Sequence, residues 1–468
     1  MTERQQLPPL TEVPLFRATV VFGSPMVFAM AMGALFNLAD LWIVGMMDNP
    51  EVAIAAVTIP SLVNSIPMII FNGIVNAIIA LIARFHGLGN LDRANLASNQ
   101  GFLLTIILSV LFGLPPWLYA EEIVVMLGAK GDVIPGATEY LAIMSIGTFT
   151  MFLLMTITGV MRAVGNSIVP MILMGGANVL NVVLDYALIF GKWGFPEMGV
   201  AGAAWATVIA RFVFAAAGLA MLYRGFLGLQ LRKLSIAWGM MIDMLKIGVP
   251  SCMQWLVRMA SYLYILYFVG QAAPLAGRAV TDAQAAYGIG LRLDTLALFS
   301  GFGWGAAAAT LVGQNLGRGR PDRARRASWI AMGLNVAMQL VLAAIYVLFA
   351  EQLLGLMGFD IGGGANAAEV RDIGRTYLYI MSSSFVFQAT SVVLSQALAG
   401  AGATRFPLLV ELVGYVAIGY PLMQWLAERS DEWGLRGLWV GAVALHLAVA
   451  IAYLVWFRFG PWDRKEIK

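Results

Sequence analysis

The chain has 468 residues, of which 60% are hydrophobic and 12% are charged, and its formal net charge at pH 7 is +3. With a mean hydropathy of +0.80, this composition excludes an ordinary soluble globular protein and indicates one that crosses a membrane many times. One cysteine, Cys252, excludes an intrachain disulfide, and the two histidines, His86 and His446, lie far apart in the sequence. Neither a histidine metal cluster nor a Ser-His-Asp site is encoded locally, so we do not expect an enzyme.

Apolar segments long enough to span a bilayer, about 20 residues each, predict an all-α polytopic protein with twelve transmembrane helices. A polar leader with three prolines precedes the first segment, which is too long for a cleavable signal and is expected to stay as an anchor. The predicted spans are 18–47, 52–83, 98–119, 137–161, 167–190, 199–222, 245–270, 283–313, 328–350, 375–399, 406–427 and 436–458.

The distribution of Lys and Arg predicts the orientation of these helices. Nineteen basic residues fall on the side of both chain ends and seven on the other, and the remaining three, Arg211, Arg258 and Arg292, lie inside helices. The excess of positive charge places both termini in the cytoplasm of a multi-pass cell (inner) membrane protein. We interpret the basic runs as orientation signals and contacts with anionic lipids of the bilayer, and we expect no nucleic-acid partner.

An internal repeat divides the chain into two lobes. Residues 1–222 would form an N-lobe and 247–468 a C-lobe with a short cytoplasmic tail, joined by an interfacial connector at 223–246. The matched segments are Gly-Ser-Pro at 23–25 with Gly-Val-Pro at 248–250, 225 residues apart, and Asp-Arg-Ala at 92–94 with 322–324, 230 residues apart. Because six is even, the repeats are parallel, and this predicts two pseudo-symmetric six-helix lobes with substrate bound between them.

Polar residues that the second lobe does not repeat are the candidates for function. Asp40 corresponds to Ile265 in the repeat, and Asn181, Asp185 and Thr207 correspond to Val416, Tyr420 and Ala442. Asn181 and Asp185 are four residues apart and share one helix face. All four residues should lie about 9 to 12 Å below the outer face of the membrane, where they could bind a cation or share a proton.

The alternative is that these residues only form hydrogen bonds that hold the lobe together. Two acids argue against it, because a structural carboxylate in a membrane is expected to have a basic partner. In the helices of this lobe only Arg211 could serve, and it is predicted to lie nearer the cytoplasmic end. Desolvation and the neighbouring acid should favour protonation of one carboxyl, so that the pair titrates as a unit.

Several motifs resemble the multidrug and toxic compound extrusion (MATE) transporters. They are Pro25 with Asp40 and Val44-Gly45, Gly159-Val160-Met161-Arg162-Ala163-Val164-Gly165-Asn166 with Pro170, Asn181-Val182-Val183-Leu184-Asp185-Tyr186, Gly202-Ala203-Ala204-Trp205-Ala206-Thr207, and Leu311-Val312-Gly313-Gln314-Asn315-Leu316-Gly317. The resemblance covers essentially the whole chain. It implies a central cavity that alternates between the two membrane faces, and export of organic, often cationic and amphipathic, compounds against inward flow of protons or sodium ions. By resemblance, the coupling site is Asp40, Asn181, Asp185 and Thr207.

The sequence departs from relatives that couple through the second lobe. Those proteins have an acid in the seventh helix, where this chain reads Gln254-Trp255-Leu256-Val257-Arg258, so a cation site in the second lobe is not predicted. We interpret Arg258 as the partner of Asp294 at a similar depth in the membrane, in a structural or gating ion pair, with substrate contact as the alternative. Glu411, near the cytoplasmic end of its helix, is compatible with either a structural or a functional role.

Other polar residues are candidates for lining the substrate cavity. Asn72 and Asn76 are spaced four apart in the second predicted helix, and Gln284 and Tyr287 lie in the eighth. Gln254 and Arg258 complete this set. Met and aromatic side chains beside them would suit varied apolar ligands, although any one of these residues could serve packing alone.

The energy source is expected to be an ion gradient. No lysine is followed by Ser or Thr, so the chain has no Walker A loop for ATP. We therefore predict a monomeric antiporter with no cofactor and no metal beyond a sodium ion at the coupling site, in which ion entry bends the first helix at Pro25. The alternatives are a flippase for a lipid-linked saccharide, which would require a basic cavity, a membrane-embedded enzyme and a passive channel.

Overall fold

The structure is a computed structural model that describes residues 11–229, 236–356 and 366–464. Within these residues all regular secondary structure is helical, and twelve stretches are long and apolar enough to cross a membrane. The first six are α1 (Leu15–Val44), α2 (Pro50–Gly87), α3 (Leu91–Leu118), α5 (Val133–Ala163), α6 (Ile168–Ile189) and α7 (Gly199–Tyr223). The last six are α8 (Trp238–Leu275), α9 (Val280–Gly317), α10 (Pro321–Leu348), α12 (Ala367–Met381) with α13 (Phe385–Gly400), α14 (Arg405–Glu411) with α15 (Tyr420–Glu428), and α16 (Ser430–Phe459). The predicted fold class is confirmed.

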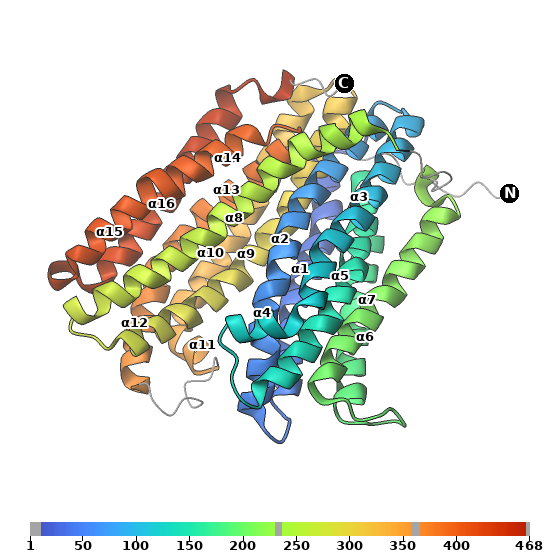
Figure 1. The fold of residues 1–468 in the computed structure, drawn as a ribbon. Helices are drawn as coiled ribbons and strands as arrows, with labels where there is room; N and C mark the ends of the chain where they lie inside the picture. Colours follow the sequence, from blue (N-terminus) through green and yellow to red (C-terminus); the bar gives the residue numbers. More distant parts are fainter. Residues whose placement is uncertain (1–10, 230–235, 357–365, 465–468) are drawn as a thin grey trace.

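The two halves repeat one order of elements. A short helix follows the third span, α4 (Ala120–Met126), and another follows the ninth, α11 (Ala350–Leu356). Figure 1 shows the helices of the first half, blue to green, gathered on one side of the molecule and most helices of the second half, yellow to red, on the other. The N- and C-terminal ends lie at the same end of the bundle (Figure 1), as an even number of spans requires.

Helix α8 begins at Trp238, seven residues before the predicted span, so the end of the segment predicted as a connector is helical. The charged side chains of Asp243 and Lys246 lower the hydropathy of this first part of α8, which is why the predicted span begins later. They form an ion pair of 3.0 Å on the exposed face of the helix, which lets the helix extend beyond its apolar part. The Ala237 N–H donates to Gln100 Oε1 at 2.9 Å and so ties the start of α8 to α3. Residues 230–235 of the connector lie outside the described residues.

Glycines bring the two halves together near the end of the bundle that holds the termini. A Cβ at Gly87 in α2 would lie 2.3 Å from the carbonyl oxygen of Gln314 in α9. A Cβ at Gly317 would lie 2.2 Å from the carbonyl oxygen of Arg84. Side chains at these positions would collide with backbone, so only glycine permits this approach. Here α2 and α9 pack backbone against backbone and close the space between the halves.

Helix α1 runs through Pro25 as one helix. Proline has no backbone N–H, so the carbonyl oxygen of Val21, four residues earlier, has no helical donor. The Ser167 hydroxyl, at the start of α6, lies 3.5 Å from that oxygen and is placed to donate to it. This contact supports α1 at its weakest point, and bending at Pro25 stays a prediction.

Candidate functional site

Asn181 and Thr207 connect α6 and α7 through a side-chain hydrogen bond. Asn181 Nδ2 donates to Thr207 Oγ1 at 3.2 Å, and that hydroxyl donates to the carbonyl oxygen of Ala203 at 3.1 Å. Asn181 is buried, and its amide oxygen makes no hydrogen bond within the described residues. An oxygen acceptor and a hydroxyl oxygen therefore lie together beside the acids described next.

Asp185 lies one helical turn from Asn181 on α6 and is 1% exposed. Its carboxyl group is adjacent to that of Asp40 in α1, close enough for a hydrogen bond if one of the two carries a proton. Asp40 Oδ1 and both carboxylate oxygens of Asp185 are buried and accept no hydrogen bond from any described residue. Two unsatisfied carboxylates in a membrane interior are costly, and a proton or a small cation between them would remove that cost.

The four residues predicted for ion coupling are thus brought together, and their role remains a prediction. The donor set contains carboxylate, amide and hydroxyl oxygens, which are hard ligands suited to sodium as well as to a proton. Among the described residues, no group of three or more His, Cys, Asp and Glu side chains is arranged to hold a metal ion. Only two acids contribute here, which fits a monovalent cation better than a divalent one.

Two further residues interact electrostatically with this site: Arg211, which the sequence offered only as a possible partner of the acids, and Tyr140, which was not predicted. The positive charge of Arg211 in α7 acts on Asp40 and on Tyr140 in α5, and the charges of both acids reach the phenol of Tyr140. Arg211, named from the sequence as the one possible basic partner in this lobe, thus interacts electrostatically with Asp40, and its predicted depth nearer the cytoplasmic end stays a prediction. The signal was present in the sequence, because Arg211 follows Thr207 by four residues and shares its helix face.

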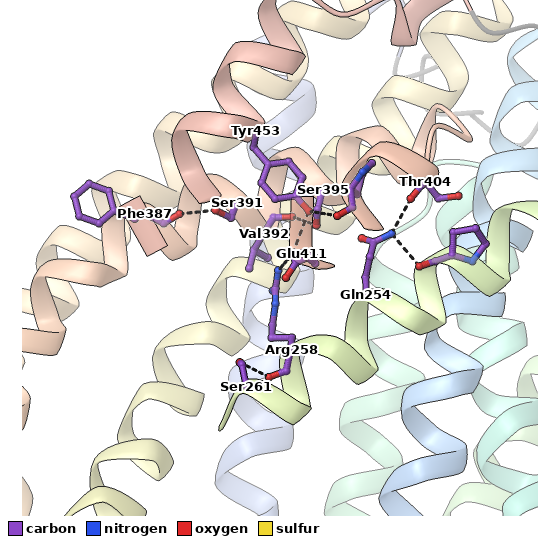
Figure 2. Close-up of polar contacts among 12 residues, drawn as sticks. Gln254, Arg258, Ser261, Phe387, Ser391, Val392, Ser395, Thr404, Glu411 and Tyr453 are labelled. Carbon is purple, nitrogen blue, oxygen red and sulfur yellow. Dashed lines mark hydrogen bonds and ion pairs between the residues drawn. The ribbon is translucent and has the colours of Figure 1, made fainter. Parts of the chain in front are cut away.

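A cavity between the halves collects three of the predicted substrate residues, Asn76, Gln254 and Arg258. Its wall comes from α2, α8, α9 and α13, and the remaining lining residues are Ser251, Trp255, Phe302, Val392, Ser395, Gln396 and Ala399. The Gln254 amide donates to the carbonyl oxygens of Pro250 and Thr404, at 3.2 and 3.1 Å (Figure 2). The α13 residues were missed because their approach to α8 depends on tertiary packing alone.

Arg258 forms an ion pair with Glu411 in α14, not with Asp294 as predicted. Figure 2 shows Arg258 reaching from α8 toward Glu411, with Tyr453 of α16 beside the carboxylate. The Tyr453 hydroxyl donates to Glu411 Oε1 at 3.1 Å. The prediction used only the depth of each residue in the membrane, and depth does not say which way a side chain points from its helix. The face of α8 that carries Arg258 points toward α14.

Asp294 and Tyr287 belong to a second, separate cavity. Tyr377 in α12 donates to Asp294 Oδ2 at 2.6 Å, while Asp294 Oδ1 is buried and has no partner among the described residues. Tyr262, Trp439 and His446 also line this cavity. Tyr287 stacks on Trp439 with ring centroids 5.8 Å apart. The acid is therefore surrounded by aromatic rings inside the second half.

The other predicted cavity residues lie elsewhere. Asn72 Nδ2 donates to the carbonyl oxygen of Met68 within α2 at 2.9 Å, and Gln284 packs against Gly270, where a Cβ would lie 2.8 Å from its Nε2. Neither residue lines the two cavities described above. Arg292 is exposed on α9 and does not line them either, which weakens the alternative of a basic cavity for a lipid-linked saccharide.

Comparison with solved structures supports the fold. One, described as the outward-facing conformation of a multidrug resistance MATE family transporter of the MOP superfamily, has a TM-score of 0.86 at 22% identity and covers 97% of this chain and 98% of its own. Another is a MOP superfamily transporter from Pyrococcus furiosus, whose description says that the reverse polarity of its binding pocket suggests a different function. Its TM-score is 0.87 at 22% identity, and the match covers 99% of this chain and 100% of that structure.

Sequence relatives extend along the same length. A protein of Thermotoga maritima described as "Probable multidrug resistance protein NorM" is 29% identical over 392 residues, covering 82% of this chain and 80% of the relative. One with the same description in Agrobacterium fabrum is 27% identical over 465 residues, covering 97% and 95%. The MatE family profile matches residues 25–187 and 247–425. The chain therefore belongs to the MatE family, the MATE transporters, and is a membrane transporter and not an enzyme.

Proposed function

We propose that this protein exports small organic, amphipathic compounds by antiport with protons or sodium ions through alternating access. It needs no organic cofactor in this proposal, acts as a monomer, and lies in the cell inner membrane with both termini in the cytoplasm. The multidrug resistance description of its relatives supports the substrate class, and the absence of a Walker A lysine supports an ion gradient as the energy source.

One observation carries the coupling proposal: the adjacent carboxyl groups of Asp40 and Asp185, three of whose oxygens are buried and lack a hydrogen-bond donor among the described residues. With both acids ionised and Arg211 charged, the site has a net charge of −1. One bound proton or sodium ion neutralises it. Binding of a single monovalent cation would then stabilise the packing of α1 against α6, while its release would leave unpaired charge between the two helices.

The experiment is dye efflux from proteoliposomes in which proton and sodium gradients are imposed separately. Asp40→Asn should abolish gradient-driven efflux while leaving equilibrium dye binding intact, because it removes the coupling acid without reaching the central cavity. Asp92→Asn is a matched control, since Asp92 lies in the first turn of α3, outside the site. Wild-type efflux under one gradient alone identifies the ion, and undiminished gradient-driven efflux by Asp40→Asn refutes the proposal.

A further inference from the structure

The central cavity between α2, α8, α9 and α13 has one charged lining residue, Arg258. A guanidinium stays protonated at any physiological pH, so the cavity wall carries a permanent positive charge, which is paired on one side with Glu411. Its other polar lining side chains are neutral amides and hydroxyls, including Asn76 and Gln396. Among the described residues no carboxylate lines this cavity, which sets it apart from one built to attract organic cations.

The ion pair with Glu411 orients the guanidinium of Arg258 but uses only part of its hydrogen-bonding capacity. Only Nη2 of Arg258 donates to Glu411, and within the described residues the other N–H groups of the guanidinium donate to no protein atom. Glu411 is fully buried and accepts a hydrogen bond from Tyr453 (Figure 2), and it is not among the residues that line the cavity. The Arg258 side chain keeps 12% of its surface exposed and lines the cavity, so an acceptor in the cavity can use its remaining N–H groups.

An aromatic surface lies directly beside this charge. The rings of Trp255 in α8 and Phe302 in α9 have centroids 5.0 Å apart. The Arg258 guanidinium carbon lies 5.6 Å from the centroid of the Trp255 ring. A ligand with an aromatic body packed on these rings would place a group attached to that body next to the guanidinium.

We propose that the preferred ligand of this cavity is an amphipathic aromatic anion, with a carboxylate or phosphate bound by Arg258 and its rings packed against Trp255 and Phe302. Such an anion would be the substrate class of the exporter proposed above, and only the direction of its transport rests on that proposal. The binding preference itself follows from the cavity, whatever ion drives the cycle.

Three fluorescent probes with the same pyrene body and an anionic, a neutral or a cationic end group test the preference. They are pyrenebutyrate, pyrenebutanol and pyrenebutylamine, titrated into purified protein in a neutral detergent without any gradient. Because guanidinium–carboxylate hydrogen bonds are among the strongest in proteins, the wild type should bind the anion about tenfold more tightly than the amine. Arg258→Gln should reduce that ratio to about one. Wild-type protein that binds the amine as tightly as the anion overturns the proposal, and so does an unchanged ratio in Arg258→Gln.

Two matched variants separate ligand binding from structural support. Arg292→Gln makes the same charge change at an exposed position of α9 outside the cavity and should leave the ratio unchanged. Glu411→Gln removes the competing carboxylate and should tighten pyrenebutyrate binding several-fold, opposite in sign to Arg258→Gln. Equal weakening by both neutralisations would mean that the pair is structural, and would overturn the proposal. Should Arg258→Gln fail to fold, Arg258→Lys keeps the charge, loses the planar fork, and should weaken the anion alone.

Competition identifies where the anion comes from. Displacement of pyrenebutyrate by naphthoate but not by dihexanoyl phosphatidate assigns the site to soluble aromatic anions, and the reverse order assigns it to a lipid phosphate; displacement by neither overturns the proposal. Asp92→Asn, in the first turn of α3 and outside both sites, should keep the wild-type ratio in this binding assay. Loss of gradient-driven efflux and loss of anion preference are thus measured separately, and either can fail without the other.

Discussion

Asp40 of α1 and Asp185 of α6 lie with their carboxyl groups side by side in the membrane interior, and three of their four oxygens are buried without a hydrogen-bond donor among the described residues. The two helices are the first and the fifth membrane spans of the chain. A charge change at this contact therefore alters how α1 packs on α6, which is the link between ion binding and movement that an antiporter needs.

Thr207→Val distinguishes sodium from proton coupling. The change keeps the shape of the side chain but removes the hydroxyl that accepts from Asn181 at 3.2 Å. If sodium uses that oxygen as a ligand, half-maximal efflux should need roughly tenfold more sodium, equivalent to about 1.4 kcal/mol. Proton-driven efflux would change little. Thr105→Val is the matched control, because its hydroxyl is hydrogen-bonded to Thr156 at 2.6 Å, away from the site; an equal effect there would contradict a ligand role for Thr207.

Arg211→Met should make the site hold its cation more tightly. Without the guanidinium the two ionised acids carry −2 instead of −1, and the lost repulsion is worth about 1 to 2 kcal/mol at the separations usual for such groups. Half-maximal efflux should then occur at a lower sodium concentration, or at a higher pH under a proton gradient. The turnover rate should fall because the cation is released more slowly. Efflux titrations against sodium and pH measure both. Arg292→Met provides the control, and cation affinity in Arg211→Met that stays at the wild-type value would show that Arg211 does not act on the acids.

Tyr377→Phe should destabilise the second half. Its hydroxyl is the sole described donor to Asp294, at 2.6 Å, and its removal leaves a buried carboxyl group unsatisfied at a cost of about 1 to 3 kcal/mol. Asp294→Asn should cost less, since an amide oxygen still accepts from Tyr377. The melting temperatures of the two variants in detergent measure this difference. Tyr346→Phe, which removes a 2.7 Å bond to the Leu293 carbonyl oxygen, is the control for a neutral acceptor, and it should lower the melting temperature less than Tyr377→Phe.

Gly317→Ala should open the contact between the halves. The added Cβ would lie 2.2 Å from the Arg84 carbonyl oxygen, which must move. Cys252, the sole cysteine of the chain, is a built-in reporter because it is buried where α8 meets α2 and contacts the Ile70 carbonyl oxygen at 2.8 Å.

Maleimide labelling of Cys252 should accelerate about tenfold for each 1.4 kcal/mol by which opening becomes easier. Gly288→Ala, on the same helix with open space around the new Cβ, should label at the wild-type rate. Labelling of Gly317→Ala at that same rate would show that the contact adapts without opening.

The sequence by itself determined the twelve spans, because a chain in lipid must satisfy its backbone hydrogen bonds within helices and therefore shows long apolar runs. It also pointed to the polar residues that lie around Asp40. Their spacing along single helices, such as the four residues from Asn181 to Asp185, fixes a shared face, and the internal repeat exposed them as unmatched.

Only the tertiary structure decided which faces meet. Arg258 and Asp294 have similar depth, yet Arg258 turns to Glu411 and Asp294 to Tyr377, because hydropathy records height in the membrane and not rotation about the helix axis. The same limit hid the contribution of α13 to the central cavity. Pairings between helices far apart in the chain depend on how their side chains pack, and packing is a property of the assembled bundle.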